Sequence, residues 1–263
     1  MNTARSAVLV RVALGLGGLA LCLVLLVAIW VGLLFFPQPF FDKKLGMGDL
    51  VLYADGASGT AFESEAREAL RRLAAIEGLE PGRRIRVFFC GSQRRYAFFA
   101  KLARVHPLTQ GFGLYYAGSV FVSEAGLAAS AGKAVPHSRL EGAVAHVIAH
   151  EAAHFVLVRE FGFRASRALP VWKSEGFADW AATRATRAVS PKDDYRTRLG
   201  ILLDDEHWPP GENHLRDFLR WQLLAEFHFD IANHSREEFF NPALREAQLW
   251  GDLSRWMRIE DGP

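Results

Sequence analysis

Hydrophobic and polar positions divide the chain into an apolar start and a mixed body. Residues 12–36 contain no charged side chain. A helix of that length crosses a hydrocarbon core about 30 Å thick. We therefore expect a transmembrane anchor at 12–36, preceded by a short N-terminal segment at 1–11 and followed by a linker at 37–49.

A cleaved signal peptide is the main alternative for this apolar run. Its apolar region would be about 7–15 residues long and would end at a small-residue cleavage site. Here the run is longer, and the sequence that follows, FFPQPFF, offers no such site. A lipoprotein signal also fits poorly, because the bulky Leu21 precedes Cys22 and apolar residues continue beyond it. The pattern favours an uncleaved anchor.

Charges on either side of the run bear on its orientation. Arg5 and Arg11, together with the α-amino group, slightly outweigh Lys43 and Lys44 on the far side. Because positive charge favours the cytoplasmic side, we predict a single-pass protein of the bacterial inner membrane. Residues 1–11 would lie in the cytoplasm and the body in the periplasm.

In the first part of the body apolar residues often alternate with polar ones, as in strands, and in the later part they recur at helical spacing. From residue 140 onward the chain is mostly helical, and Ser235 with Glu238 three residues later predicts a helix N-terminus with a capping box. The fold class is therefore α+β: a small αβ layer with a β-hairpin, then a mostly helical half, in one domain at 50–263. The earlier elements are strands at 50–54 and 84–90, helices at 61–77 and 93–104, and a hairpin at 113–123.

Composition changes this prediction little. The formal net charge is +2, and basic residues are matched locally by acidic ones, so nothing indicates a nucleic-acid-binding surface. Cys90 is the only cysteine outside the apolar run, which excludes a disulfide within the body.

The helix predicted at 143–162 carries three histidines, at four-residue spacing. His146, His150 and His154 therefore share one face of that helix. With Glu151, the last two form the H-E-x-x-H arrangement, in which two imidazoles bind zinc and the glutamate acts as general base. Zinc lowers the pKa of its water to near 7, and a neighbouring carboxylate can take the proton.

The alternative is a helix whose histidines only cap, pack or form hydrogen bonds. However, the histidines are interspersed with aliphatic and aromatic side chains, which predicts a buried helix. Burial without a partner is costly for imidazole, so the context favours a metal site. The apolar neighbours are Val144, Val147, Ile148, Phe155, Val156 and Val158.

A second segment, at 169–182 (LPVWKSEGFADWAA), offers the third zinc ligand. Glu175 follows His154 by 21 residues, enough for the chain to turn and return a carboxylate from an adjacent helix. Asp179, one turn later, could accept the second N–H of a metal-bound histidine. Separately, the two acids could be a helix-start residue and an exposed neighbour; their joint spacing after H-E-x-x-H favours the metal site.

These two motifs, HEAAH and PVWKSEGFADW, resemble the gluzincin metallopeptidases, most closely the compact bacterial peptidase-MA-like group. The resemblance implies a minigluzincin-like fold, Zn²⁺ bound by His150, His154 and Glu175, Glu151 as base and Asp179 behind His150. It also implies a hairpin edge strand that pairs with an extended peptide substrate. Membrane-anchored stress-response gluzincins share Glu-x-x-Ala-Asp but usually have more membrane spans.

Two further histidines are predicted to belong to the site. His146 is predicted either to contact a zinc ligand or line the pocket, or to be a satisfied core histidine. The resemblance also implies a tyrosine or histidine on a later helix that stabilises the oxyanion, and His214 is predicted for this role, with Tyr195, His207 and His234 as alternatives.

Together these features predict a membrane-anchored zinc endopeptidase acting on peptides or proteins. A non-catalytic domain that binds metal or a partner at the membrane is the alternative, although it would not need Glu151. A structural assembly factor with an incidental motif would bind no metal.

Overall fold

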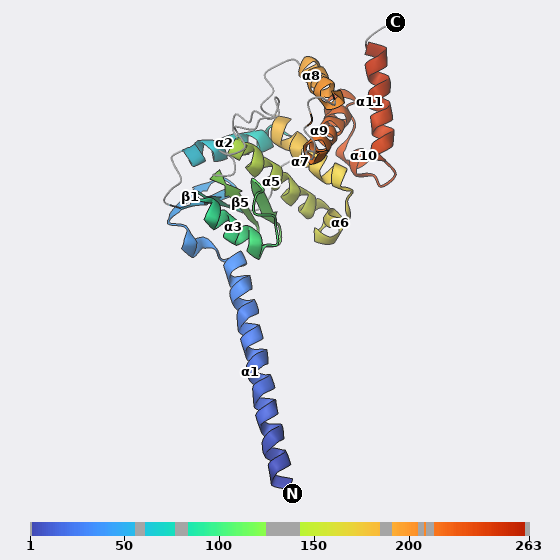
Figure 1. Cartoon of the computed structure of the whole chain (residues 1–263). Helices are drawn as coiled ribbons and strands as arrows, with labels where there is room; N and C mark the ends of the chain where they lie inside the picture. Colours follow the sequence, from blue (N-terminus) through green and yellow to red (C-terminus); the bar gives the residue numbers. More distant parts are fainter. Residues whose placement is uncertain are drawn as a thin grey trace.

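A computed structural model describes residues 2–55, 61–76, 84–124, 143–184, 191–204, 208 and 213–260. The protein is α+β, as predicted. A long helix, α1 (Asn2–Phe35), projects from a body in which a mixed sheet adjoins a helical half (Figure 1).

The sheet has five strands in the order β1-β2-β3-β5-β4. The three central strands are parallel, and each edge strand is antiparallel to its neighbour. The predicted strands and hairpin are confirmed. The strands are β1 (Lys43–Met47), β2 (Leu50–Ala54), β3 (Ile85–Cys90), β4 (Gly111–Leu114) and β5 (Ser119–Ser123).

The prediction of a linker over residues 37–49 is wrong in its second half. Lys43 pairs with Ala54 and Met47 pairs with Leu50, so β1 is the edge strand of the sheet. Its sequence, KKLGM, contains only two large apolar residues, Leu45 and Met47, which are half-buried, and its other residues are exposed. The fold therefore begins before residue 50.

Alternating side chains give the sheet two apolar faces. One face packs under α2 (Ala61–Ala74) and α5 (Ala143–Phe161). The other packs against α3 (Gln93–Leu102) and the end of α1. Strand residues on the first face include Leu50, Leu52, Ile85, Val87, Val120 and Val122; those on the second include Phe88, Phe112, Leu114 and Phe121.

The helical half is built outward from α5. Helix α7 packs against both α5 and α9. The predicted capping box at Ser235, which begins α10, is confirmed. Helix α5 ends beside Gly162, whose φ of +77° is incompatible with a continued α-helix. The remaining elements are α6 (Phe163–Ala168), α7 (Val171–Thr183), α8 (Pro191–Leu203), α9 (Asn213–Glu226), a π-helical turn (Phe227–Ile231), α10 (Arg236–Phe240) and α11 (Glu246–Glu260).

Helix α1 contains a 22-residue segment, Leu14–Phe35, long and apolar enough to cross a membrane. Its last turns are fixed to the body. The indole of Trp30 donates to the carbonyl of Leu102 at 3.0 Å, and the Arg86 guanidinium donates to the carbonyl of Phe35 at 2.9 Å. A short 3₁₀ turn, Gln38–Phe40, then leads directly into β1.

Candidate metal centre

Helices α5 and α7 bring the three predicted zinc ligands together. His150 Nε2 lies 3.2 Å from His154 Nε2 and 3.3 Å from one carboxylate oxygen of Glu175. The other Glu175 oxygen lies 3.6 Å from His154 Nε2. Donor atoms of three side chains from two helices thus lie close enough together to hold one metal ion.

These separations fit a tetrahedral metal. Two ligands about 2.0–2.2 Å from zinc, at the tetrahedral angle, are separated by about 3.3 Å. Imidazole nitrogen and carboxylate oxygen are both donors that zinc accepts. The residues present therefore fit the ion that the sequence pattern implies.

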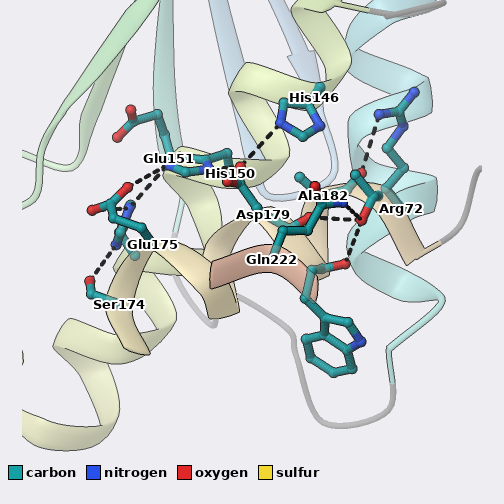
Figure 2. A network of polar contacts seen from close by, with 12 residues as sticks. Arg72, His146, His150, Glu151, Ser174, Glu175, Asp179, Ala182 and Gln222 are labelled. Atoms are coloured by element: carbon teal, nitrogen blue, oxygen red, sulfur yellow. Dashed lines mark hydrogen bonds and ion pairs between the residues drawn. The ribbon is translucent and has the colours of Figure 1, made fainter. Parts of the chain in front are cut away.

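The opposite nitrogen of each histidine has its own partner. Asp179 Oδ1 lies 2.8 Å from His150 Nδ1, and Ser174 Oγ lies 3.2 Å from His154 Nδ1. Figure 2 shows Asp179 below His150, and Ser174 and Glu175 on the adjoining helix. Such contacts fix the ring orientation and leave Nε2 to face a metal.

His146 joins the same carboxylate. Its Nε2 lies 3.3 Å from Asp179 Oδ1, and Figure 2 shows its ring directed toward that acid. His146, His150 and Asp179 also form a second group of metal donors. However, 2.8 Å between His150 and Asp179 is a hydrogen-bond length, shorter than a tetrahedral ligand edge. The geometry favours a supporting contact.

Opposite charges within the cluster shift the pKa values of His150, Asp179 and Glu175. Burial lowers the pKa of His150, but the carboxylates of Asp179, Glu175 and Glu151 together outweigh burial and hold that pKa well above its ordinary value. Burial raises the pKa of Asp179, but His150 and His146 lower it to about 2. Burial also raises the pKa of Glu175, but the imidazoles of His150 and His154 outweigh burial and lower it. Both acids are carboxylates at neutral pH.

Glu151 is buried and turned toward the hairpin. Its Oε2 accepts a hydrogen bond from the Tyr115 hydroxyl at 3.2 Å. The Tyr115 ring packs against His154 and Phe155, with centroids 5.7 and 5.2 Å away. Burial and the carboxylates of Glu151 and Glu175 raise the pKa of Tyr115, so its hydroxyl stays protonated and can donate.

Strand β4 can lie beside Glu151 because the residues on the strand face toward α5 are glycines, which have no side chain. Gly111 and Gly113 face α5, whereas Phe112 and Leu114 face the opposite core. A Cβ on Gly113 would lie 2.7 Å from Glu151 Oε2, closer than nonbonded atoms allow. The hairpin supplies the expected edge strand, and the structure places that strand next to the histidine helix.

Residues predicted for the oxyanion role lie elsewhere or outside the described residues. The hydroxyl of Tyr195 is buried and donates to the carbonyl of Leu223 at 3.1 Å. His234 is exposed and pairs with Glu238 at 3.6 Å. His214 begins α9, but its side chain lies outside the described residues, as does His207. Sequence reasoning missed Tyr115, since a tyrosine in a hairpin turn carries no distinguishing signal.

A scan against models of known protein families finds no match for this chain, and a search of curated proteins finds no similar sequence.

Proposed function

We propose that the protein is a membrane-anchored, zinc-dependent endopeptidase. The observation that carries this proposal is the convergence of His150, His154 and Glu175: the two Nε2 atoms lie 3.2 Å apart, and each lies 3.3 or 3.6 Å from a different oxygen of the Glu175 carboxylate. Glu151 follows His150 directly and contributes a further carboxylate, which is hydrogen-bonded to Tyr115.

His150, His154 and Glu175 would hold the ion. When bound, zinc would supply a Lewis acid and a water of lowered pKa. A carboxylate oxygen of Glu151 would take the proton from the attacking water and pass it to the leaving amine nitrogen. Tyr115 would hold that carboxylate through its hydrogen bond to Oε2, while Asp179 and Ser174 orient the two imidazoles.

Peptide binding is proposed at β4. Among the strands of the described residues this one is at the edge of the sheet, so one side of its backbone has no strand partner there. An extended peptide can add to such an edge through main-chain hydrogen bonds. Because Gly113 of β4 adjoins Glu151, a peptide bound there would run past the proposed base. This arrangement supports a peptide or protein substrate.

We also propose a bacterial inner-membrane location with the body in the periplasm. The apolar helix supports anchoring, and the slight excess of positive charge before it supports a cytoplasmic N-terminus.

Metal content and hydrolysis of the purified full-length chain test the peptidase proposal. The whole chain in detergent is preferable to a domain without the anchor, because the end of α1 packs against the sheet and β1 begins at Lys43. About one zinc per chain is expected. His150→Ala, His154→Ala and Glu175→Ala should each lower zinc occupancy, and stoichiometric zinc in all three would disprove the ligand assignment.

Glu151→Gln separates catalysis from metal binding. This variant should keep its zinc but hydrolyse casein or a peptide library at least ~10²-fold more slowly, because the base is lost. Glu160→Gln, on the same helix but paired with Arg236 at 2.9 Å, is the matched control and should retain activity. A zinc-loaded wild type without hydrolysis would instead indicate the non-catalytic metal-binding alternative.

A further inference from the structure

Exposed aromatic side chains gather where α1 enters the body. Between 39% and 67% of each is exposed, which is unusual for rings of this size on a soluble surface. We call them the aromatic collar: Trp30, Phe36, Phe40, Phe98, Tyr116 and Phe163.

The collar is continuous with the anchor. Tyr116, in the hairpin turn, contacts both Phe35 of α1 and Phe163 of α6, with ring centroids 5.4 and 6.3 Å away. Phe40, just after α1, lies 6.3 Å from Phe98 of α3. The collar thus joins the anchor to three separate parts of the body.

The end of α3 reaches down along the anchor. The carbonyl of its last residue, Leu102, accepts a hydrogen bond from Trp30. Trp30 lies five residues before Phe35, the last residue of α1, and is therefore about 7 Å from that end along the helix axis. The uncharged run begins at Val12, and the 19 residues from there to Trp30 form a helix about 28 Å long, close to the thickness of a hydrocarbon core. A membrane that covers residues 12–30 therefore has Trp30 and Leu102 at the depth of its interface. Figure 1 shows α3 on the side of the body from which α1 leaves.

Basic side chains accompany the collar. Lys101 and Arg104 are exposed at the end of α3, and Arg164 and Arg167 are exposed on α6. Neither helix contains an acidic residue. Surfaces that bind an anionic bilayer combine aromatic side chains at headgroup depth with neighbouring lysine and arginine side chains.

We propose that the aromatic collar and these four basic residues seat the body in the headgroup layer of an anionic membrane. The body is then held against the bilayer at a fixed height instead of moving on a tether. Lipid is the occupant that fits because the collar is continuous with the membrane span and lies at its depth. This proposal depends on the anchor and is independent of peptidase activity.

Spin labels on the full-length chain test the seating. With Cys22→Ser, single labels at Phe98→Cys and Phe163→Cys are placed in nanodiscs of phosphatidylcholine and phosphatidylglycerol. Collision rates with oxygen, which concentrates in lipid, and with a water-soluble nickel chelate are then compared. Leu203→Cys on α8 is the control, because Leu203 is 56% exposed and Figure 1 shows α8 at the end of the body opposite to α1.

The ratio of oxygen to nickel collisions should be several-fold higher at 98 and 163 than at 203. It should decrease in pure phosphatidylcholine, because the charge attraction is lost. A ratio equal to that at 203 would overturn the proposal. Protection from both reagents would also overturn it, since a protein would then cover the collar. If the Phe98 variant fails to fold, Lys101→Cys reports on the same surface without removing an apolar side chain.

Discussion

The Tyr115 hydroxyl lies 3.2 Å from Glu151 Oε2 and joins the β4–β5 hairpin to the helix that carries His150 and His154. Residue 115 is 36 positions before its partner. The contact fixes the acid proposed as the general base.

Tyr115→Phe should therefore slow hydrolysis without releasing metal. A hydrogen bond to a charged group is worth about 1.5 kcal/mol or more, so we expect kcat to fall about ten-fold. Zinc content and peptide turnover measure the two effects. Tyr116→Phe, on the neighbouring exposed ring, is the control and should change neither; equal turnover in both variants would refute the positioning role of Tyr115.

The bare face of β4 gives a second prediction. Gly113→Ala would place a methyl group 2.4 Å from the Tyr115 ring and 2.7 Å from Glu151 Oε2, so both side chains must move. We expect a large loss of turnover. Gly46→Ala on the opposite edge strand meets no atom within 4 Å and is the matched control. Normal activity in Gly113→Ala would show that this close packing is unimportant.

Removing the carboxylate behind His150 should weaken metal binding. Asp179→Asn removes the charge that holds the ring, and zinc affinity should fall roughly 10–100-fold, as measured by competition with a chromophoric chelator. His146→Gln removes only the longer contact to the same oxygen and should have a smaller effect. Asp252→Asn, an exposed acid on α11, should leave the affinity unchanged; the same result for Asp179→Asn would make that acid structurally incidental.

The His150–Asp179 contact predicts how the stability of the metal-free protein depends on pH. A raised His150 pKa stabilises the fold below its ordinary value of 6.5, and this contribution is lost as pH rises through the folded value. The lowered Asp179 pKa stabilises the fold above 3.8, and this contribution is lost as pH falls toward 2. The contact is therefore strongest between pH 3.8 and 6.5.

Thermal unfolding in chelator should give the highest melting temperature in that window. Zinc should raise the melting temperature most at alkaline pH, where His150 is ready to bind metal without releasing a proton. In Asp179→Asn the decrease on the alkaline side should flatten. The prediction is contradicted if, without metal, the melting temperature of the wild type exceeds that of Asp179→Asn by more at pH 8.5 than at pH 5.5.

Membrane orientation can be tested in cells with a C-terminal epitope tag. External protease should digest the body in spheroplasts but not in intact cells. A body protected in spheroplasts would place it in the cytoplasm. Release of a shortened soluble form would instead support a cleaved signal peptide.

Local sequence determined the features that depend on spacing within one element. The four-residue spacing of His150 and His154 places them on one helical face, and the uncharged run before residue 37 specifies a helix able to span a membrane. The side-chain pattern predicted strands at 50–54 and 84–90, and the structure has them at 50–54 and 85–90, because burial on a sheet face repeats every second residue.

Only the tertiary structure decided which distant groups meet. KKLGM becomes a strand because β2 offers its edge, since a strand of low apolar content forms only when a partner supplies its hydrogen bonds. Tyr115 reaches Glu151 because bare glycines let β4 approach α5. One oxygen of Asp179 faces both His146 and His150 because α7 packs along α5. Such contacts depend on how elements pack, and packing is a property of surfaces formed by residues far apart in the chain.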